Sequence, residues 1–544
     1  MSGDDWIRVP VGPDAAERRT VRPDRLVLAA VRTTTCAYRL IDDVLPLLAG
    51  DRRVETVFTV VPGSAYEDAV APFLRACGAR VLPWEQAVAT RFDLALTASA
   101  NGDLHRLDAP VIVMPHGAGH SRRLRPDDAA TASGLAAEQL THDGRVVPRT
   151  VLLGHREQRA RLERLCPDAA PRAVVVGDPC LDRMRAGAMW RDRYRAALGV
   201  GDHQRLVLVT ATWGPGSQLR GRPALVDELL AVLPADDFRV ALVQHPNVWE
   251  GHGAYSCTGW LTAARESGLV VLPPRDGWRA GLVASDLVVG DHGSVTLYAA
   301  ALGRPVLLAG FDPGEVTGDS PMAELARKAP VLASGPGLRE HVEDALRNPP
   351  PVRTDWFDNV DGAHAALRTV LYDVLGLAEP PGPAAVYAVA RPEARIEPVH
   401  THRVHAHVEP GSGVVRIERF PARLADPYEV GAGLRHLVSD VEEPVLGAVQ
   451  SADVLLHRGP AAPDWAARAL ADHPGARFAA VVAQGCDIRT RGGARIVAHS
   501  ETPCDPTLFA SLAYALTLGG RQPLPAEAVL HVASDRVRVA FTSY

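Results

Sequence analysis

The sequence predicts an α/β protein in which two parallel-sheet domains face each other across a cleft and a C-terminal α+β region follows. First, short apolar runs rich in β-branched residues alternate with longer amphipathic stretches from Arg25 onward. This alternation is typical of parallel sheets covered by helices on both faces. Second, the pattern starts again at Arg205. Third, a period-two pattern, typical of hairpins, replaces it after Arg395.

The first domain is predicted at 25–180, after a polar N-terminal extension (1–24) without an apolar stretch of the signal-peptide kind. Its predicted strands are Arg25–Val31, Val54–Val61, Ala79–Leu82, Asp93–Thr97, Pro110–Met114, Thr150–Leu153 and Ala173–Val176. Its predicted helices are Ala37–Leu48, Tyr66–Cys77 and Arg156–Leu165.

The second domain is predicted at 181–378. Its predicted strands are Arg205–Thr210, Phe238–Gln244, Leu269–Leu272, Leu287–Val289 and Pro305–Leu308. Its predicted helices are Leu181–Leu198, Ala224–Val232, Leu261–Ser267, Gly277–Ala284 and Ser294–Leu302. Two such Rossmann-like halves turn the carboxyl ends of their strands toward a shared crevice, which is where open α/β sheets bind ligands.

A Pro-rich linker is predicted at 379–394, and an α+β accessory domain of unassigned role at 395–544. Two hairpins are predicted there, Arg395–Phe420 around Pro410–Gly413 and Phe478–Ser500 turning at Arg491–Gly493. The segments Trp465–Leu470 and Thr507–Thr517 are predicted to be helices.

Composition narrows the class of protein. Hydrophobic residues make up 47% and charged residues 22% of the 544 residues, as in a globular protein. The formal net charge of -6 argues against nucleic acid as a partner, because no basic excess would neutralise phosphates. The seven scattered cysteines form no C-x-x-C pair, which argues against a disulfide framework. No run approaches the roughly 18 apolar residues of a membrane span. We expect a cytoplasmic protein, at most peripheral to a membrane.

Two histidines end predicted strands. His116 follows an apolar strand and precedes Gly117, so its imidazole stands on a tight turn at the carboxyl edge of a sheet. Histidine titrates near neutral pH, which suits a general base. The alternative is that His116 merely ends the strand. His245 occupies the matching place in the second domain, and Pro246 restricts its backbone.

A third motif, Asp291-His292-Gly293-Ser294, lies between a predicted strand and a predicted helix. The free N–H groups and the dipole at a helix start attract anions. Gly293 would allow close approach of a phosphate, and the hydroxyls of Ser294 and Thr296 would add donors. The alternative is that Asp291 is only a helix N-cap.

Taken in order, these motifs resemble the GT-B superfamily. The order is His116-Gly117, Gly177-Asp178-Pro179-Cys180-Leu181-Asp182, the strand ending Thr210-Ala211-Thr212-Trp213, His245-Pro246 and Asp291 to Ser294. Within that superfamily it is most similar to the CDP-glycerol glycerophosphotransferases of teichoic acid synthesis, the polymerase and primase type. The UDP-N-acetylglucosamine 2-epimerases share the Gly-x-Pro, His-Pro-Asn and Asp-Ser-Gly-Gly elements. The resemblance spans roughly Arg25 to Leu375, about two thirds of the chain.

The resemblance implies roles for individual residues. His116 would deprotonate an acceptor hydroxyl, and His245 would contact the donor phosphates or stabilise charge on the leaving nucleotide. The residues implied to bind the donor phosphates are Asp291, Gly293, Ser294, Thr296 and Thr212. The residues implied to line the cleft are Gly117, Pro179, Trp213 and Pro246. No metal or other cofactor is implied, because GT-B enzymes generally use helix dipoles and side chains instead.

The chain departs from the glycerophosphotransferase pattern at several positions. Pro115 stands where that pattern has Trp, Ala211 where it has Pro, and His292-Gly293 where it has Tyr-Ser. These differences leave the nucleotide and the transferred group open. They agree better with a nucleotide-activated donor in general than with glycerol phosphate in particular.

A histidine-rich strand lies outside the resemblance. With period two, His405, His407 and Glu409 share one face, and two imidazoles at i, i+2 can chelate zinc. The alternative, a solvent-facing polar hairpin, is favoured because no further ligand is visible in the sequence.

Three functions are compatible with these observations. The first is a transferase that moves a glycosyl or glycerophosphoryl group from a CDP- or UDP-linked donor to an acceptor hydroxyl. The second is an epimerase-like hydrolase or isomerase acting on a nucleotide sugar alone, which would need acidic residues of the first domain such as Asp93, Asp103 or Asp108. The third is a non-catalytic binding or scaffold protein. The sequence does not predict the oligomeric state.

Overall fold

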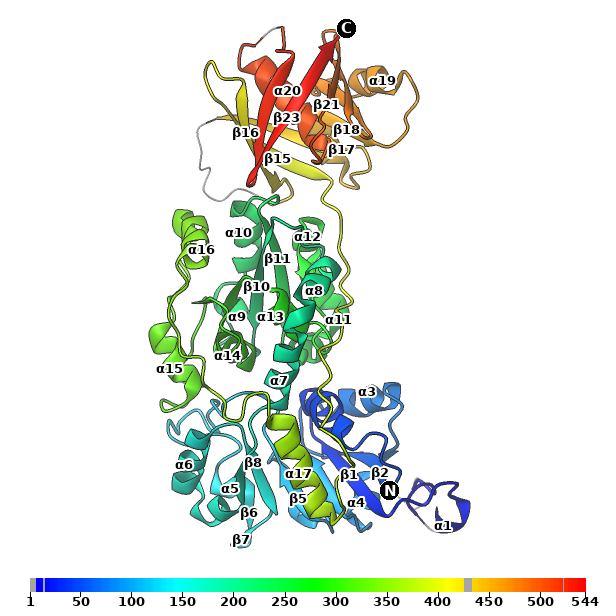
Figure 1. Ribbon diagram of the computed structural model, residues 1–544, viewed down its shortest axis with the longest axis vertical. Coiled ribbons are helices and arrows are strands. Elements are labelled where there is room, and N and C mark those ends of the chain that lie inside the picture. The colour runs from blue at the N-terminus through cyan, green and yellow to red at the C-terminus, as the bar shows by residue number, and fades with distance from the viewer. Residues whose placement is uncertain (1–5, 13–14, 425–432, 522) are drawn as a thin grey trace.

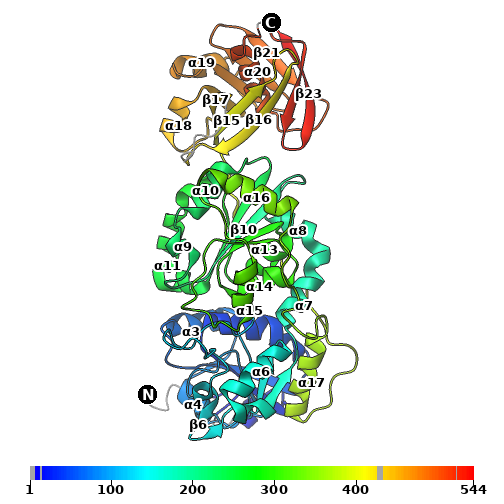
Figure 2. The same ribbon diagram turned by 90° about the vertical axis from the view of Figure 1, so that its left-hand side faces the viewer.

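The chain folds into three units that follow one another along the long axis of the molecule (Figure 1). The computed structural model describes residues 6–12, 15–424, 433–521 and 523–544, so parts of the predicted N-terminal extension and C-terminal region lie outside the described residues. The view turned by 90° shows the same succession (Figure 2). Two parallel sheets and a C-terminal closed barrel confirm the predicted class, two Rossmann-like α/β domains with an α+β appendage.

The first lobe is built on a seven-stranded parallel sheet in the order β3-β2-β1-β4-β5-β8-β9. Its interior strand β1 is buried from Val27 to Val31, which explains its continuous apolar sequence. The strands are β1 (Arg25–Val31), β2 (Val54–Val60), β3 (Val81–Leu82), β4 (Leu94–Thr97), β5 (Val111–Val113), β8 (Thr150–Leu153) and β9 (Ala173–Val175), with the small hairpin β6 (Thr141–His142) and β7 (Arg145–Val146) beside them.

Short helices cover this sheet. They are α2 (Thr34–Tyr38), α3 (Val70–Ala76), α4 (Trp84–Val88), α5 (Ala137–Leu140) and α6 (Arg156–Leu165), with α1 (Ala15–Arg18) in the N-terminal extension. The predicted helix Ala37–Leu48 is wrong in form: α2 begins at Thr34, where the Thr33 side chain caps it, and passes into a π-helix (Arg39–Val44) and a 3₁₀ turn (Leu45–Leu47). Pro46 in the last turn cannot donate an α-helical hydrogen bond, which favours this change.

The second lobe contains a five-stranded parallel sheet in the order β12-β11-β10-β13-β14. Its strands are β10 (Arg205–Ala211), β11 (Phe238–Gln244), β12 (Val270–Val271), β13 (Leu287–Gly290) and β14 (Val306–Leu308). Its helices are α9 (Gln218–Gly221), α10 (Leu225–Val232), α11 (Pro246–Trp260), α12 (Thr262–Glu266), α13 (Trp278–Ala284), α14 (Ser294–Ala301), α15 (Pro321–Lys328) and α16 (Leu338–Arg347). The strand order reverses beside β1 in the first lobe and beside β10 in the second, which creates a crevice at the carboxyl edge of each sheet.

Helical segments connect the lobes at two places. The first crossing is α7 (Pro179–Ala186) and α8 (Arg191–Ala197), which a 3₁₀ turn (Gly187–Trp190) separates where the sequence predicted one continuous helix. The second is α17 (Ala363–Leu375), which falls in the range predicted for the second domain but lies against the first lobe (Figure 1). Its Leu367, Leu371, Tyr372 and Leu375 pack into the core of that lobe.

A buried ionic cluster joins the lobes where α7 begins. The Asp178 carboxylate caps α7 by accepting hydrogen bonds from the N–H groups of Cys180 (2.8 Å) and Leu181 (3.1 Å). It also accepts hydrogen bonds from both terminal nitrogens of Arg39 of the first lobe, each at 3.1 Å. The Tyr298 hydroxyl of the second lobe donates to it at 2.9 Å. One carboxylate with 3% exposure therefore connects both lobes and the crossing helix.

Asp43 anchors the same cluster from the first lobe. Its carboxylate forms ion pairs with Arg39 (3.2 Å), Arg183 of α7 (2.7 Å) and Arg279 of α13 (3.1 Å). Although burial by itself would raise the pKa of Asp43, the neighbouring guanidinium groups hold that pKa at about 2.

The C-terminal unit is a closed barrel in the order β15-β16-β22-β23-β21-β20-β19-β18-β17, wrapped around one helix. That helix, α20 (Thr507–Leu518), is buried from Thr507 to Leu516 (Figure 1). The strands of the barrel are β15 (Thr401–Val408), β16 (Val414–Pro421), β17 (Leu434–Asp440), β18 (Val454–Arg458), β19 (Phe478–Val482), β20 (Cys486–Thr490), β21 (Arg495–His499), β22 (Glu527–Val532) and β23 (Asp535–Ser543). Two outer helices are α18 (Leu446–Ser451) and α19 (Trp465–Asp472).

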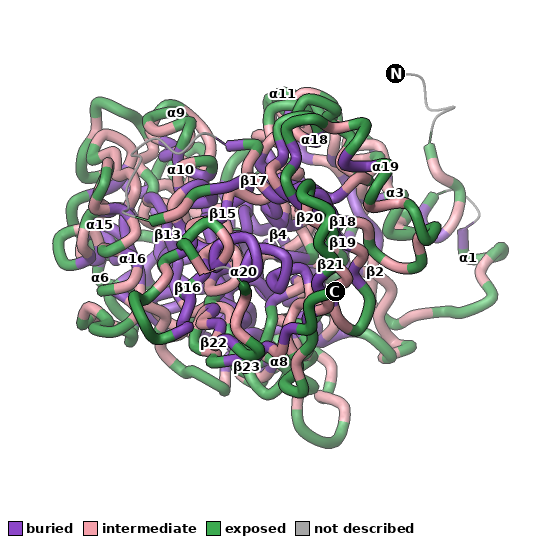
Figure 3. The backbone as a smooth tube through the Cα atoms, turned by 90° about the horizontal axis from the view of Figure 1, so that it is seen from above, coloured by how far each residue is buried: buried purple, intermediate pink, exposed green. Residues whose placement is uncertain are grey.

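The two hairpins predicted in this unit have different outcomes. The first corresponds to β15 and β16, which pair as antiparallel neighbours. The second is wrong as a simple hairpin, because Phe478–Ser500 contains three antiparallel strands with an additional turn at Gly485. In the view from above, buried segments run through the middle of the molecule and exposed segments follow its outer loops (Figure 3).

The barrel docks on the second lobe at the edge opposite the crevice. Arg419 of β16 pairs with Asp236, which lies just before β11, at 2.5 Å, and with Asp505 of the barrel at 2.7 Å. Its carbonyl accepts a hydrogen bond from the N–H of Ala235 at 2.8 Å. Because Asp236 precedes the strand whose other end carries His245, the barrel lies away from the carboxyl edge. Within the described part of the chain, no helix is long and apolar enough to cross a membrane.

Replacing Asp178 by Ala should destabilise the two-lobed body, because buried Arg39 would lose one of its two carboxylate partners and α7 its cap. We expect a loss of about 3–5 kcal/mol in unfolding free energy, measured by urea denaturation. The matched control is Glu85→Ala, which removes an exposed pair with Arg106 and should cost less than about 1 kcal/mol. Equal losses in both variants would contradict the importance of this cluster.

Candidate active site

A cavity of about 630 Å³ lies between the two lobes. From the first lobe it is lined by residues that follow the carboxyl ends of β1, β4 and β5, including Arg32, Ser99, Asn101 and His116. From the second lobe it is lined by residues that follow β10, β11 and β13, including Thr212, Trp213, His245 and Ser294. The cavity therefore lies at the reversal points of both sheets, as the strand order predicts.

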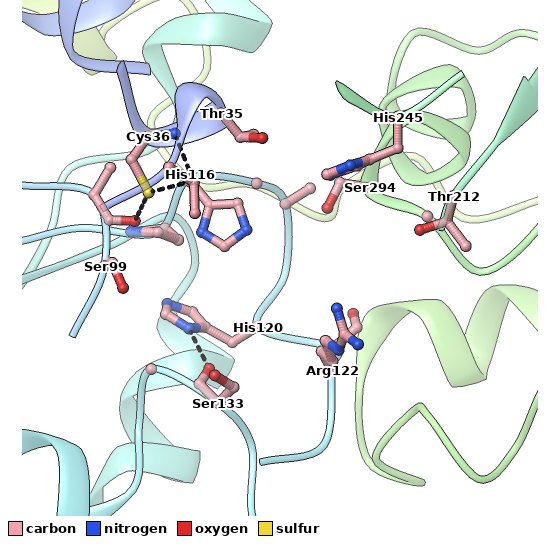
Figure 4. Close-up of a pocket in the computed structure, with 18 of the residues that line it drawn as sticks. Thr35, Cys36, Ser99, His116, His120, Arg122, Ser133, Thr212, His245 and Ser294 are labelled. Atoms are coloured by element: carbon pink, nitrogen blue, oxygen red, sulfur yellow. Dashed lines mark hydrogen bonds between the residues drawn. The ribbon is translucent and has the colours of Figure 1, made fainter. Parts of the chain in front are cut away.

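His116 stands on the first-lobe wall with its side chain exposed to the cavity (Figure 4). Although the ring is open to the cavity, the surrounding protein disfavours the charged imidazolium and lowers the pKa of His116 below its ordinary 6.5. A hydrogen bond with the backbone of Ala98 opposes this effect, and the charges of Arg122 and Arg39 add to it. The ring is consequently neutral at pH 7 and able to accept a proton.

Gly117 brings the two walls into contact. A Cβ atom on this residue would lie 2.5 Å from the Oγ of Ser294, closer than side-chain packing permits. Gly117 thus lets the turn after β5 approach the start of α14 directly. The first N–H groups of α14 have no partner within the helix, and Gly293 and Ser294 line the cavity beside them.

His245 caps α11 from the second-lobe wall. Its Nδ1 accepts a hydrogen bond from the N–H of Asn247 at 3.1 Å, so the neutral ring carries its proton on Nε2. Burial lowers the pKa of His245 to about 3, and the nearby charges of His116 and Arg122 act in the same direction. The ring is therefore a neutral hydrogen-bond donor near pH 7. Pro246 follows it at the first position of α11 and also lines the cavity.

Asp291 does not face the cavity, contrary to its predicted place among phosphate-binding residues. Its side chain has 0% exposure and accepts the N–H groups of Thr212 (2.8 Å), Gly293 (3.0 Å) and Gln218 (3.3 Å). Burial raises its pKa, whereas His292 and these three hydrogen bonds oppose the rise. Asp291 fastens the ends of β10 and β13 to each other, which fixes the positions of Thr212 and Gly293.

Two further predicted residues lie outside the cavity lining. Thr296 is fully buried in α14, where its side chain packs against Gly290 rather than facing a ligand. Pro179 is buried as the first residue of α7, behind Asp178. Both predictions treated residues next to a turn as part of its surface, but the first turn of a helix points its side chains in several directions. Thr212 and Trp213 both line the cavity.

His120 and Arg122 line the cavity although the sequence analysis assigned no role to either. His120 has a left-handed backbone (φ 45°), and its Nδ1 donates to the Ser133 carbonyl at 3.2 Å. Burial, with the charges of Arg161 and His116, lowers the pKa of His120 to about 4, although the hydrogen bond with Ser133 opposes this effect. The repeated histidine in His116-Gly117-Ala118-Gly119-His120 was the sequence signal that could have identified it.

His292 distinguishes this site from the motif that it resembles. Its Nε2 lies 3.2 Å from Glu315, whose other oxygen accepts the N–H of Gly216 at 3.1 Å. Both His292 and Glu315 line the cavity. Among the described lining residues, Glu315 carries the only carboxylate, and these two contacts already engage it.

The histidine-rich strand shows no sign of a metal centre. Among the residues that the structure describes, no group of three or more His, Cys, Asp and Glu side chains is arranged to hold a metal ion. His405 lies against the ring of Phe420, and His407 and Glu409 are exposed on β15 and the turn after it. His407 and Glu409 therefore face solvent, whereas His405 is half-buried.

Comparison with known proteins gives structural likeness only. A scan against models of known protein families finds no match, and a search of curated proteins finds none either. Among solved structures, the wall teichoic acid polymerase TagF is 14% identical, with 65% of this chain and 89% of that chain covered and a TM-score of 0.43.

Two sugar-nucleotide epimerases are also similar in structure. The UDP-GlcNAc 2-epimerase from Neisseria meningitidis bound to UDP-GlcNAc is 11% identical, covering 64% of this chain and 99% of that chain with a TM-score of 0.39. The UDP-GlcNAc 2-epimerase from Methanocaldococcus jannaschii is 13% identical, with the same coverage and a TM-score of 0.40.

The His245 ring should stay neutral, with its proton on Nε2, from pH 8 down to about pH 5. Its pKa of about 3 means that protonation begins only well below that range. Nitrogen NMR of ¹⁵N-histidine-labelled protein measures this directly, with the His245→Gln variant providing the assignment. An unburied histidine would titrate near 6.5 in the same samples. Titration of the His245 signal above pH 5 would contradict the predicted environment.

Proposed function

We propose that the chain is a transferase that moves a glycosyl or glycerophosphoryl group from a CDP- or UDP-linked donor to an acceptor hydroxyl. The observation that carries this proposal is the neutral imidazole of His116, open to a cavity whose opposite wall contains the start of α14. A base on one wall and an anion-attracting helix start on the other are what the transfer of an activated group requires.

The proposed reaction uses both walls. His116 takes the proton of the acceptor hydroxyl as its oxygen attacks the anomeric carbon or the phosphorus of the transferred group. The bond from that atom to the nucleotide phosphate breaks, and the phosphate leaves with the electron pair. The Nε2–H of His245, the Ser294 hydroxyl and the N–H groups of α14 would stabilise the charge that develops on the leaving phosphate. His245 can do this because its neutral form is a donor.

The distribution of carboxylates favours a transferase over an epimerase-like hydrolase. The second function was expected to use acidic residues of the first lobe, and Asp93, Asp103 and Asp108 do not line the cavity. Asp93 instead accepts the N–H of Leu26 at the amino end of the sheet, at 2.8 Å. The described lining of the first lobe contains histidines, arginines and neutral polar side chains, and no carboxylate, where that chemistry would need acids.

Replacing His116 by Ala should lower turnover by roughly 10²- to 10⁴-fold while leaving nucleotide affinity largely intact, because the ring acts on the acceptor. Nucleotide release from CDP-glycerol, CDP-ribitol and common UDP- and GDP-sugars, with candidate acceptors, measures turnover, and calorimetry measures affinity. His105→Ala, an exposed histidine of the same lobe outside the cavity, is the control. Unchanged turnover in the His116 variant would exclude the base role.

Replacing Ser294 by Ala should weaken donor binding by roughly 3- to 10-fold, the effect of one lost hydrogen bond to a charged group. Calorimetry with CDP- and UDP-linked ligands measures the change. Ser133→Ala, on the first-lobe side, should leave donor affinity unchanged. If the unaltered protein binds no nucleotide at all, the third function, a scaffold without catalysis, would replace this proposal.

A further inference from the structure

Arg122 places a positive charge inside the cavity. It belongs to the first lobe, in the loop after β5, yet its guanidinium lies 4.4 Å above the ring of Trp213 in the second lobe. In Figure 4 it lies on the side of the cavity where Thr212, His245 and Ser294 come together, whereas His116 lies on the other side. Arg122 is therefore a first-lobe side chain located at the second-lobe wall.

The backbone around Arg122 is fixed by the second lobe. Arg122 and Val316 form an antiparallel bridge between the lobes. The Arg123 N–H donates to the Glu315 carbonyl at 2.8 Å, and the Thr317 N–H donates to the Ser121 carbonyl at 2.9 Å. The Arg122 side chain thus starts from a position held on both sides, and its stack on Trp213 sets its direction. This preorganisation reduces the entropy that ordering a long side chain on a ligand would cost.

The Arg122 guanidinium has N–H groups that are available to a ligand. Its side chain is exposed, and among the described residues it contacts the Trp213 ring while no carboxylate or carbonyl oxygen accepts a hydrogen bond from it. Glu315, the carboxylate in the described lining, is engaged by His292 and by the N–H of Gly216. A planar guanidinium with free N–H groups suits the oxygens of a phosphate, to which it can bond in a bidentate manner.

The groups around the Arg122 charge favour the binding of an anion. The starts of α11 and α14, at Pro246 and Ser294, both meet the cavity on this side, and their dipoles are positive there. The Arg122 charge lowers the pKa values of both His116 and His245, so it acts on both rings. An anion between the lobes would be attracted by Arg122 and by both helix starts together.

We propose that Arg122 binds the diphosphate of the nucleotide-linked donor across the cleft, so that both lobes hold the donor phosphates. Taking the donor as the source of the diphosphate rests on the proposed function. The stack on Trp213 leaves the edge of the guanidinium free for phosphate oxygens. Because the charge comes from the first lobe, a bound diphosphate also links the loop at 121–123 to the start of α14. Lysine could supply the charge at this position but neither the stack nor the bidentate contact.

The test is calorimetry on the full chain with Arg122→Gln and Arg122→Lys. The ligands are inorganic pyrophosphate, CDP, UDP, cytidine, uridine and glycerol 3-phosphate. Arg122→Gln should lower the affinity for pyrophosphate, CDP and UDP by roughly 10- to 100-fold and leave the affinity for the uncharged nucleosides unchanged. The diphosphate affinity of Arg122→Lys should lie between that of Arg122→Gln and that of the unaltered protein. Arg125→Gln is the matched control, since Arg125 lies in the same loop but pairs with Glu138 at the surface.

The outcomes separate this proposal from the proposed function. Unchanged diphosphate affinity in Arg122→Gln would overturn the role of Arg122 while the nucleotide-binding function stands. If that variant only melts at a lower temperature, Arg122 is a structural contact and the proposal is overturned. Loss of glycerol 3-phosphate binding without loss of diphosphate binding would assign Arg122 to the acceptor and overturn the proposal. Arg122-dependent pyrophosphate binding in a protein that binds no nucleotide would support the diphosphate site and overturn the proposed function.

Discussion

The carboxylate of Asp178 is the contact on which the two-lobed arrangement depends. It caps α7, accepts Arg39 from the first lobe and receives the Tyr298 hydroxyl from the second. A buried charge of this kind requires all its partners at once, because any missing one leaves an unsatisfied polar group in a low-dielectric interior. With Asp43 and its three arginines, it fixes how the carboxyl edges of the two sheets face each other. The cavity between them has its shape only in that arrangement.

The cavity combines neutral imidazoles with unneutralised positive charge. Enclosure by protein keeps His116, His120 and His245 uncharged, which makes the first available as a base and the last as a donor. The positive charge comes instead from Arg122 and from helix starts, neither of which changes with pH near neutrality. Proton transfer and anion binding are in this way assigned to different groups. Asp291, which accepts the N–H of Gly293 just before α14, is buried and bonded to backbone amides and does not line the cavity.

The sequence predicted the sheets better than their connections. Strands such as β1 and β10 are continuous apolar runs, so burial on both faces marks them without any tertiary information. Helix interruptions at Pro46 and Gly187 and the third strand near Gly485 depend on packing and on turn geometry that periodicity does not record. At the site, His116 and His245 were predictable because each ends a strand. Arg122 was not, because its place depends on a loop that pairs with the other lobe.

By itself, the sequence determined the class of fold, the repetition of a parallel-sheet unit and the strand ends at which polar residues gather, because hydrophobic periodicity and turn residues act locally. Only the tertiary structure decided which of those residues share one cavity. In the tertiary structure Asp291, Thr296 and Pro179 lie outside the cavity lining. Gly117 lies against Ser294, and Arg122 of the first lobe stacks on Trp213 of the second. The reason is physical: the direction of a side chain and the approach of two lobes depend on long-range packing and buried charge pairs. Neither leaves a periodic signal in the chain.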